Sequence, residues 1–429
     1  MSNLLIWSKR VLLIAVVCLF VVVLLARIGG NSMGGGKVQI RWWNMFAGPD
    51  GKHALGMVRA FNESHPEVHA SMQRLEFNTF YSKVFVAGLG GRSPEVFIVH
   101  SDLLPRFVQA GLVRPLDDLI AESGISKQDF DPNIFEAVTF EDSVYAIPLD
   151  IHPMGMYYNA TMFEKAGVVD ENGTAKAPET GLEFLEAIKK ITNIGGRAFV
   201  ITWARINMYT IMQQFNGRMF NEDFSVCTLN SAENVRALKY IVDLIYEDEL
   251  IPRPQNLDPY TGFRQGNVGI VFEGPWMMHD FMKSEDFEVK VASIPQFGER
   301  PATWANSHSL VISADIPDEK LDAAWSFIEY ISDESLTWAK AGQVPARRSV
   351  RESEGFKSMI AQGEFARQIE NVEYFPRVPY LFEFLGEFDL AIERALRGEM
   401  SPQEALDRAT DRINDVIERN HDMKRNGAS

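Results

Sequence analysis

Aromatic and acidic side chains at one strand-to-helix turn are the first candidates for chemistry in this sequence. The segment 263–277 contains a short apolar run, Val268 to Phe272, that is typical of a buried strand, and Glu273 follows it. Pro275 suits the first position of a new helix, where its missing N–H would be unpaired in any case. Open α/β sheets bind ligands at the carboxyl ends of their strands. Trp276 is therefore either a platform for a ligand or, as buried aromatic rings more often are, part of the core.

Patterns that indicate catalysis or metal binding are weak elsewhere. The sequence contains neither G-x-S-x-G nor H-E-x-x-H. His65 and His69 are four residues apart, but Pro66 between them disfavours a shared helix face. Tyr157 and Tyr158 could bind ferric iron as phenolates, yet neighbours on a strand point to opposite faces. Acidic residues are abundant enough for a pair that hydrolyses glycosides, although nothing singles out two of them. We expect no metal, no cofactor and no catalytic residue.

Composition narrows the class of protein. The 429 residues are enough for two or three domains, and 46% hydrophobic with 23% charged residues is the balance of a folded globular chain. A net charge of −16 argues against a nucleic-acid partner. Of two cysteines, Cys18 lies in the N-terminal apolar run and Cys227 is alone in the body, so the body forms no internal disulfide.

The N-terminus predicts export. Lys9 and Arg10 precede the uncharged run from Val11 to Ala26, and Arg27 ends it. This run is long for the core of a signal peptide and a little short for a spanning helix, so both an uncleaved anchor and an atypical cleaved signal stay open. In either case the basic flank stays cytoplasmic and the remainder is exported. Residues 28–36, with five glycines, read as a flexible tether.

The elements that position these residues alternate between strands and helices. This alternation predicts a mostly parallel α/β sheet in the first part of the body. Strands are predicted at 38–43, 68–72, 95–99, 198–202, 268–272, 289–294 and 310–313, with a short extended segment at 154–159. Helices are predicted around 55–61 and at 79–89, 103–110, 182–191, 207–215, 232–246, 321–331, 336–341, 381–397 and 402–419. Ser231 and Ser401 are the expected N-caps of two of them.

Several motifs in a fixed order resemble those of the extracellular solute-binding proteins of bacterial ABC importers, in the sugar-binding, maltose-binding-like group (family 1). The motifs are Gly91-Arg-Ser-Pro-Glu-Val96, Tyr145-Ala-Ile-Pro148, Tyr157-Tyr-Asn159, Phe163-Glu-Lys-Ala-Gly167, Phe263 with Gly266 and Phe272-Glu-Gly-Pro-Trp276, Ala323 to Ile328, Gly342-Gln-Val-Pro345 with Arg347, and Gly398 to Leu406. Each motif is unspecific alone, but the ordered set covers about Lys37 to Arg419. One departure lies at Pro178-Glu-Thr-Gly181, where the family usually has Thr-Trp.

The resemblance implies a fold, a function and partners. The fold would be α/β with two lobes, the type II periplasmic-binding-protein-like architecture, with mixed, mostly parallel sheets. Residues 1–36 would be the signal or anchor and tether, 37–147 plus 310–344 the first lobe, 148–309 plus 345–420 the second, and 421–429 a tail. A sugar or oligosaccharide would bind between the lobes and be trapped by hinge closure. The protein, a monomer outside the cytoplasm, would deliver it to ABC permease subunits without performing chemistry.

The resemblance also implies a set of ligand-binding residues. Carboxylates and amides hydrogen-bond sugar hydroxyls, while aromatic faces cover the C–H patches of the ring. The expected residues are Trp43, Asn44, Phe46, Glu76, Ser101, Asp102, Asp150, Tyr157, Trp203, Glu273, Trp276, Trp304, Asn306 and Arg347. A tethered sensor of the same fold and, less favoured, a secreted carbohydrate-active enzyme are the alternatives.

Overall fold

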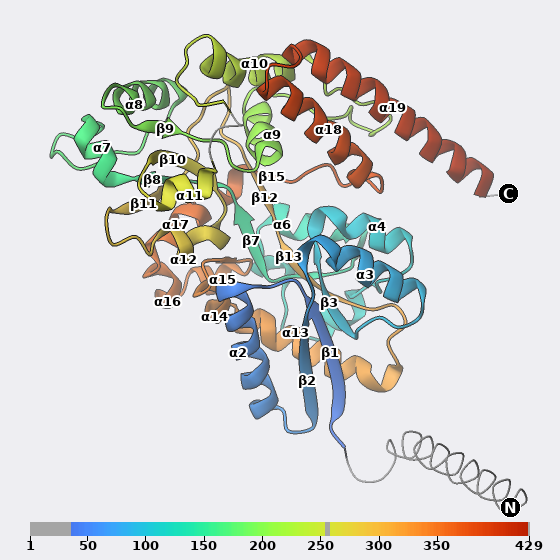
Figure 1. The fold of residues 1–429 in the computed structure, drawn as a ribbon. Coiled ribbons are helices and arrows are strands. Elements are labelled where there is room, and N and C mark those ends of the chain that lie inside the picture. The colour runs from blue at the N-terminus through green and yellow to red at the C-terminus, as the bar shows by residue number, and fades with distance from the viewer. Residues whose placement is uncertain (1–35, 254–257, 428–429) are drawn as a thin grey trace, which may run out of the picture.

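The computed structural model describes residues 36–253 and 258–427, with side chains as far as residue 420. Its first sheet has the strand order β2-β1-β3-β13-β6. Figure 1 shows helices α2, α3, α4 and α13 around this sheet, and together they form the lower lobe. The bounds are β1 Val38–Asn44, β2 Val68–Arg74, β3 Val96–His100, β6 Ile147–Pro148, β13 His308–Ile312, α2 Gly48–Ser64, α3 Phe77–Leu89, α4 Leu104–Gln109 and α13 Asp318–Asp333.

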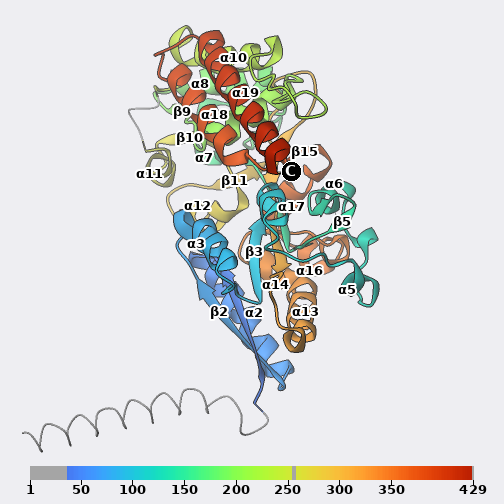
Figure 2. The same cartoon turned by 90° about the vertical axis from the view of Figure 1, so that its right-hand side faces the viewer.

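The second sheet has the order β11-β8-β10-β9 and forms the core of the upper lobe. Helices α18 and α19 pair with each other and pack on α10, over this lobe in both views (Figures 1 and 2). The bounds are β8 Gly155–Asn159, β9 Arg197–Phe199, β10 Val268–Glu273, β11 Val289–Ala292, α7 Ala160–Ala166, α8 Gly181–Asn193, α9 Ala204–Gln214, α10 Ala232–Tyr246, α11 Pro259–Arg264, α12 Met278–Phe281, α17 Ile360–Ala366, α18 Leu381–Leu396 and α19 Pro402–Gly427.

A third sheet lies between the two lobes. Its order is β14-β7-β12-β15, with bounds Val344–Pro345, Asp150–Pro153, Thr303–Asn306 and Val372–Glu373. Strand β7 runs between β6 of the first sheet and β8 of the second, and β12 runs between β11 and β13. This sheet, called the hinge sheet below, therefore contains the segments in which the chain passes from one lobe to the other.

Shorter elements complete the fold. They are α5 Asp117–Ala121, α6 Pro132–Glu136, the hairpin β4 Thr139–Phe140 and β5 Ser143–Val144, α14 Ser335–Ala339, α15 Arg348–Arg351 and α16 Glu354–Lys357. None of the helices within 36–253 and 258–427 is both long enough and apolar enough to cross a membrane. The predicted anchor or signal at 11–26 lies outside the described residues.

The sequence-based elements are largely confirmed, and the sheet pairing needs a correction. Each predicted helix overlaps an observed one, and α10 has the predicted bounds. The departure from the family pattern at Thr180 does not weaken α8, because Thr180 and Glu183 form a reciprocal capping box. Parallel pairing holds for β1 with β2 and β3, whereas β8 pairs antiparallel with both β10 and β11. The sheets are therefore mixed rather than mostly parallel, since β8 and β13 enter directly from the hinge without a crossover helix.

Strand burial also corrects the expectation for the tyrosine pair. Tyr157 and Tyr158 were expected on opposite faces, one buried and one outward, but every residue of β8 is buried. Both faces of this central strand are covered by helices, so alternation of side chains does not bring either tyrosine to solvent. The Tyr157 hydroxyl donates to the carbonyl of Gly274 at 3.0 Å, which leaves the phenol engaged inside the protein.

Candidate ligand-binding cleft

A large cleft of about 1120 Å³ runs between the lobes. Its lining comes from four places: the loops after β1 and β2, the ends of β3 and β13, the hinge sheet, and the upper-lobe elements around Trp203, Trp276 and α18. The cleft is thus open to groups from both lobes and from the strands that join them. This is the site geometry that a closing two-lobed protein requires.

Indole rings form much of its wall. Trp276 lies in a 3-10 turn between β10 and α12, with its ring centroid 6.4 Å from that of Trp203 and the two planes at 90°. Trp203 immediately precedes α9 and is 46% exposed, which is high for a tryptophan and leaves most of one ring face free. Trp304 comes from β12, and its buried Nε1–H has no acceptor in the described structure. The three indole rings therefore line the same space, while the Trp304 Nε1–H is buried behind the surface of the cleft.

The Trp276 ring rests directly on the backbone at Gly274. A Cβ atom at Gly274 would lie 2.0 Å from Cζ3 and 2.2 Å from Cη2 of the ring. The backbone there is ordinary, with φ −84° and ψ 171°, so the turn itself does not require glycine. Glycine is required because the ring occupies the space that any larger residue would fill. The motif thus fixes the direction in which Trp276 points.

Polar groups face the aromatic wall. Asp102 is buried at the end of β3, and its Oδ1 has no partner among the described residues. Burial raises the pKa of Asp102 to about 6. Asn306 on β12 is also buried and lines the cleft, and Arg205 forms a two-pronged ion pair with Asp389 of α18. An incoming ligand with hydroxyl groups would meet both acceptors and donors.

Asp50 adds a second acidic group whose ionisation is altered. It lies near the start of α2 and accepts a hydrogen bond from Gln343 Nε2 at 3.1 Å. Burial raises its pKa to about 7, although the positive field of His308 opposes the shift. Sequence reasoning did not select Asp50, because a first-turn Asp in a helix is usually read only as a partner of the helix dipole.

Asp150 is a structural hub beneath the cleft. Its carboxylate accepts from His152 Nδ1 at 3.0 Å, the His308 backbone N–H at 2.9 Å, His308 Nδ1 at 2.7 Å and Trp338 Nε1 at 2.7 Å. Burial alone would raise the pKa of Asp150, but His308 and His152 outweigh it and hold the pKa well below its usual value. The carboxylate is therefore an acceptor that ties β7, β13 and α14 together.

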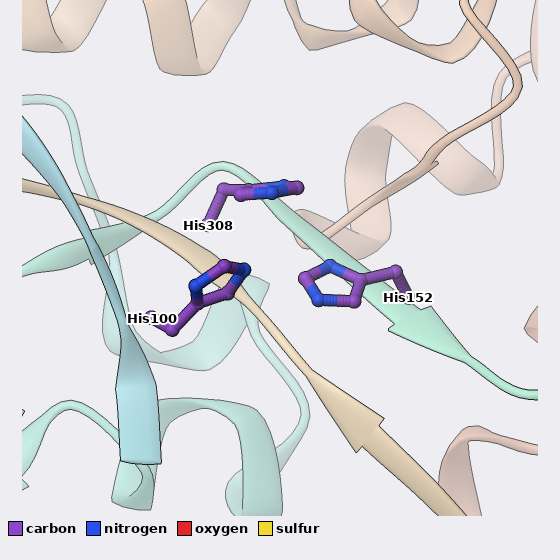
Figure 3. A group of neighbouring side chains, drawn as sticks. All are labelled: His100, His152 and His308. Atoms are coloured by element: carbon purple, nitrogen blue, oxygen red, sulfur yellow. The ribbon is translucent and has the colours of Figure 1, made fainter. Parts of the chain in front are cut away.

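Three histidines that sequence reasoning missed meet at this hub. His100 ends β3, His152 lies in β7 and His308 begins β13, and all three line the cleft. Figure 3 shows their rings gathered at one point from three separate segments, with centroids 4.5 to 5.5 Å apart. Burial lowers the pKa of both His100 and His152, which favours neutral rings. No sequence spacing connects them, so only the fold could have revealed the cluster.

The structure brings half of the predicted residues into the cleft. Those that line it are Glu76, Asp102, Trp203, Trp276, Trp304 and Asn306, together with Phe46. Glu76 also accepts from the Thr79 N–H at 3.2 Å as the N-cap of α3. The others are held elsewhere and do not belong to the lining: Trp43, Asn44, Ser101, Asp150, Tyr157, Glu273 and Arg347.

Each residue outside the lining has a visible partner or packing site. Asn44 accepts from the Phe46 N–H at 3.1 Å, and Ser101 pairs with the Ser309 hydroxyl at 2.9 Å. Trp43 packs half-buried against the core. Arg347 bonds Asp129 at 2.6 Å, and also Asp333, which directs it away from the cleft.

Glu273 is the least expected of these. It is buried at the end of β10, where Oε1 accepts from the Gly274 N–H at 3.2 Å and Oε2 has no partner among the described residues. Burial raises its pKa to about 7. Its position one residue before the Gly-Pro-Trp turn is thus a supporting one behind the aromatic wall.

Helix α18 supplies the remaining part of the lining that was not predicted. Phe382, Leu385, Ile392 and Leu396 contribute apolar surface, and Asp389, Glu393 and Arg397 contribute charges. The apolar face of an amphipathic helix looks the same in sequence whether it packs on a core or borders a cleft. No signal in the sequence could have separated the two.

Comparisons with known proteins agree with this geometry. A family model described as bacterial extracellular solute-binding protein matches residues 47–335. The maltotriose-binding protein of Pyrococcus abyssi is 23% identical over 324 residues, 73% of this chain and 68% of its own length. The maltodextrin-binding protein of Bacillus subtilis is 22% identical over 343 residues, covering 77% of this chain and 79% of its own.

Solved structures show the same fold. The GacH receptor of Streptomyces glaucescens superposes with a TM-score of 0.79 at 20% identity, over 89% of this chain and 99% of its own. The sugar-binding protein MalE of Xanthomonas citri gives 0.79 at 20% identity, over 90% of this chain and 99% of its own. The architecture is therefore the two-lobed, maltose-binding-like one. Since the family model covers more than half of the 429 residues, the chain belongs to the bacterial extracellular solute-binding protein family.

Proposed function

We propose that this protein captures a sugar or oligosaccharide in the cleft between its lobes and delivers it to the membrane permease of an ABC transporter. The observation that carries the proposal is the meeting of three indole rings, Trp203, Trp276 and Trp304, with the buried Asp102 and Asn306 in one cleft. Stacking faces and hydrogen-bonding groups together are what a pyranose ring requires. The relatives named for maltotriose and maltodextrin support the same ligand class.

The size of the cleft favours an oligosaccharide. Its volume of about 1120 Å³ exceeds the range of roughly 300–1,000 Å³ that is usual for drug-sized ligands. The lining extends from His152 at the hinge to Arg397 at the end of α18, which leaves room for more than one sugar unit. We therefore assign the indole cluster to one sugar and the α18 side to a neighbouring one.

We also propose the division into moving bodies. The first body would be residues 37–147 with 310–344, the second 148–309 with 345–420, and the hinge sheet would bend between them. The Arg106 guanidinium over the Phe382 ring at 5.1 Å already links the lobes across the cleft mouth. A protein of an extracellular family acts outside the cytoplasm, and the N-terminal apolar run would export or tether it.

Binding without chemistry is part of the proposal. Among the acidic residues in the lining, Asp389 is neutralised by Arg205 and Glu76 caps a helix. A glycosidase needs one carboxyl group as the acid and a second as the base or nucleophile on either side of the scissile bond. Of the remaining acids, Asp50 accepts a hydrogen bond from Gln343, and we assign Asp102, whose Oδ1 has no partner among the described residues, to hydrogen-bonding the ligand.

A thermal-shift screen followed by calorimetry tests the function. Malto-oligosaccharides of two to seven units are added to the purified chain, and a ligand that binds only the folded state raises the melting temperature. We expect saturable binding of at least one of them and no release of shorter sugars on prolonged incubation. Trp203→Ala should weaken that binding with only a small fall in the melting temperature of the free protein, because nearly half of the residue is exposed. Absence of binding to any oligosaccharide, or turnover of one, would refute the proposal.

A further inference from the structure

The histidine cluster at the floor of the cleft has a use that sugar binding does not explain. Three of the eight histidines in the sequence, His100, His152 and His308, meet there from β3, β7 and β13. One ring nitrogen from each lies within 4.8 Å of the other two. The three rings lie together in Figure 3, and the carboxylate of Asp150 hydrogen-bonds two of them.

The outer nitrogens of the three rings are already fixed. His152 and His308 each direct Nδ1 to one oxygen of Asp150, at 3.0 and 2.7 Å. His100 Nδ1 shares a hydrogen bond with the Tyr81 hydroxyl, whose oxygen accepts from the His100 backbone N–H at 3.1 Å. Because a carboxylate only accepts, Nδ1 of His152 and His308 carries a proton, so Nε2 is the nitrogen left to bind a metal ion.

The Nε2 atoms are the unexplained part of the cluster. Within residues 36–253 and 258–427, none of them has a hydrogen-bond partner, and none is sealed from the cleft in the way that Trp304 Nε1 is. A purely structural role accounts for the Nδ1 bonds to Asp150 and Tyr81 and leaves the three inner nitrogens without a function. A histidine that binds a metal ion usually donates its other ring N–H to a carboxylate, a backbone carbonyl or water, as His152 and His308 do to Asp150.

We propose that His100, His152 and His308 bind a divalent first-row transition-metal ion, such as Zn²⁺, through their Nε2 atoms. Three imidazoles suit zinc, copper, nickel and iron better than magnesium or calcium, which prefer oxygen. Zinc-nitrogen bonds of about 2.0–2.1 Å in a tetrahedron set the nitrogens about 3.4 Å apart. One nitrogen of each ring already lies within 4.8 Å of the other two, so the rings must move closer together to bind the ion.

Three protein ligands leave a fourth coordination position. The His152 ring lies 5.8 Å from that of Trp276 and 6.1 Å from that of Trp304, so this position faces the aromatic wall. An oxygen atom of a bound solute would complete the coordination there, as water does in open three-histidine zinc sites. The metal ion would thus occupy a part of the cleft for which the sequence indicated no metal ligand.

Zinc titration of the full chain tests the inference. The protein is prepared without a polyhistidine tag, stripped with a chelator and titrated calorimetrically with Zn²⁺. We expect one equivalent bound per chain, and at least a hundredfold weaker binding after His100→Ala. His69→Gln is the matched control, because His69 is exposed on β2 and outside the cluster, and it should bind as the wild type does.

Two further measurements separate loss of a ligand from loss of the fold. Zn²⁺ should raise the melting temperature of the wild type and of His69→Gln but not that of His100→Ala. Tyr81→Phe keeps all three imidazoles and removes only the hydroxyl that orients His100, so its zinc affinity should fall about tenfold. Co²⁺ in the same site should give the strong visible absorption of a four-coordinate ion. Binding of less than one equivalent, or equal weakening in His69→Gln, would overturn the proposal.

Discussion

The contact between Gly274 and the Trp276 ring makes a sharp test of the aromatic wall. A Cβ atom at residue 274 would lie 2.0 Å from ring carbon Cζ3, whereas carbon atoms pack at about 3.5–4.0 Å. In Gly274→Ala the ring must therefore retreat by at least about 1.5 Å. Overpacking of this kind costs about 1–3 kcal/mol of stability.

The effect of Gly274→Ala on stability should reverse when the Trp276 ring is absent. The backbone at Gly274 has a conformation that alanine adopts freely. Alanine there would stabilise the folded protein by about 0.4–1 kcal/mol, because it lowers the conformational entropy of the unfolded chain. In a Trp276→Ala background we thus expect Gly274→Ala to be neutral or slightly stabilising. The double-mutant cycle should give a coupling free energy of about 2 kcal/mol.

Urea unfolding followed by circular dichroism measures all four corners of the cycle, and calorimetry measures their affinity for the sugar found in the screen. Trp276→Ala alone should lose ~2 kcal/mol of binding free energy, roughly thirtyfold in affinity. Gly274→Ala should lose about tenfold, since it moves the ring without removing it. An equal effect of Gly274→Ala on stability in both backgrounds would show that the alanine meets something other than the Trp276 ring, and the reasoning would fail.

Three further outcomes are expected. Because burial raises the pKa of Glu273 from 4.5 to about 7, the folded state binds this proton more tightly than the unfolded chain does. The stability that the protonated carboxyl contributes is complete below pH 4.5 and is lost as the pH rises to 7, about 3 kcal/mol in all. The unfolding free energy of Glu273→Gln should therefore fall less across that pH range than that of the wild type. Phe263→Ala should cost about 3–5 kcal/mol of stability because the ring is fully buried, while sugar affinity measured well below its melting temperature stays close to that of the wild type. Small-angle scattering should show a smaller radius of gyration when the sugar is bound, and an unchanged radius would contradict hinge closure.

Sequence reasoning located the turn at Trp276 and most helices because those features are local. A buried run, a Gly-Pro pair and a capping serine act within a few residues, and each predicts its own surroundings. Strands β7, β12 and β14 are too short to show a clear hydrophobic pattern, so their pairing in the hinge sheet could not be predicted from the sequence.

The site residues that were missed depend on distant segments. Asp150 was expected in the cleft, but the fold places His152, two residues further along β7, in the lining and uses Asp150 to hold it. After β1 the chain turns so that Phe46 and Asp50 reach the cleft, while Trp43 and Asn44 stay behind them. A resemblance between motifs predicts which segments lie near the site. The direction of each side chain depends on packing against distant segments, which cannot be determined from one sequence.

The position of β13 has a consequence for how the lower lobe can come into being. This strand, His308–Ile312, fills the sheet between β3 and β6 although it follows β8 to β11 of the upper lobe in the chain. Until it arrives, β3 presents an open, fully apolar edge from Val96 to Val99, and such edges promote aggregation. The lower lobe is therefore not an autonomous folding unit, because a fragment that stops before residue 308 lacks β13 and leaves the sheet of the N-terminal lobe incomplete.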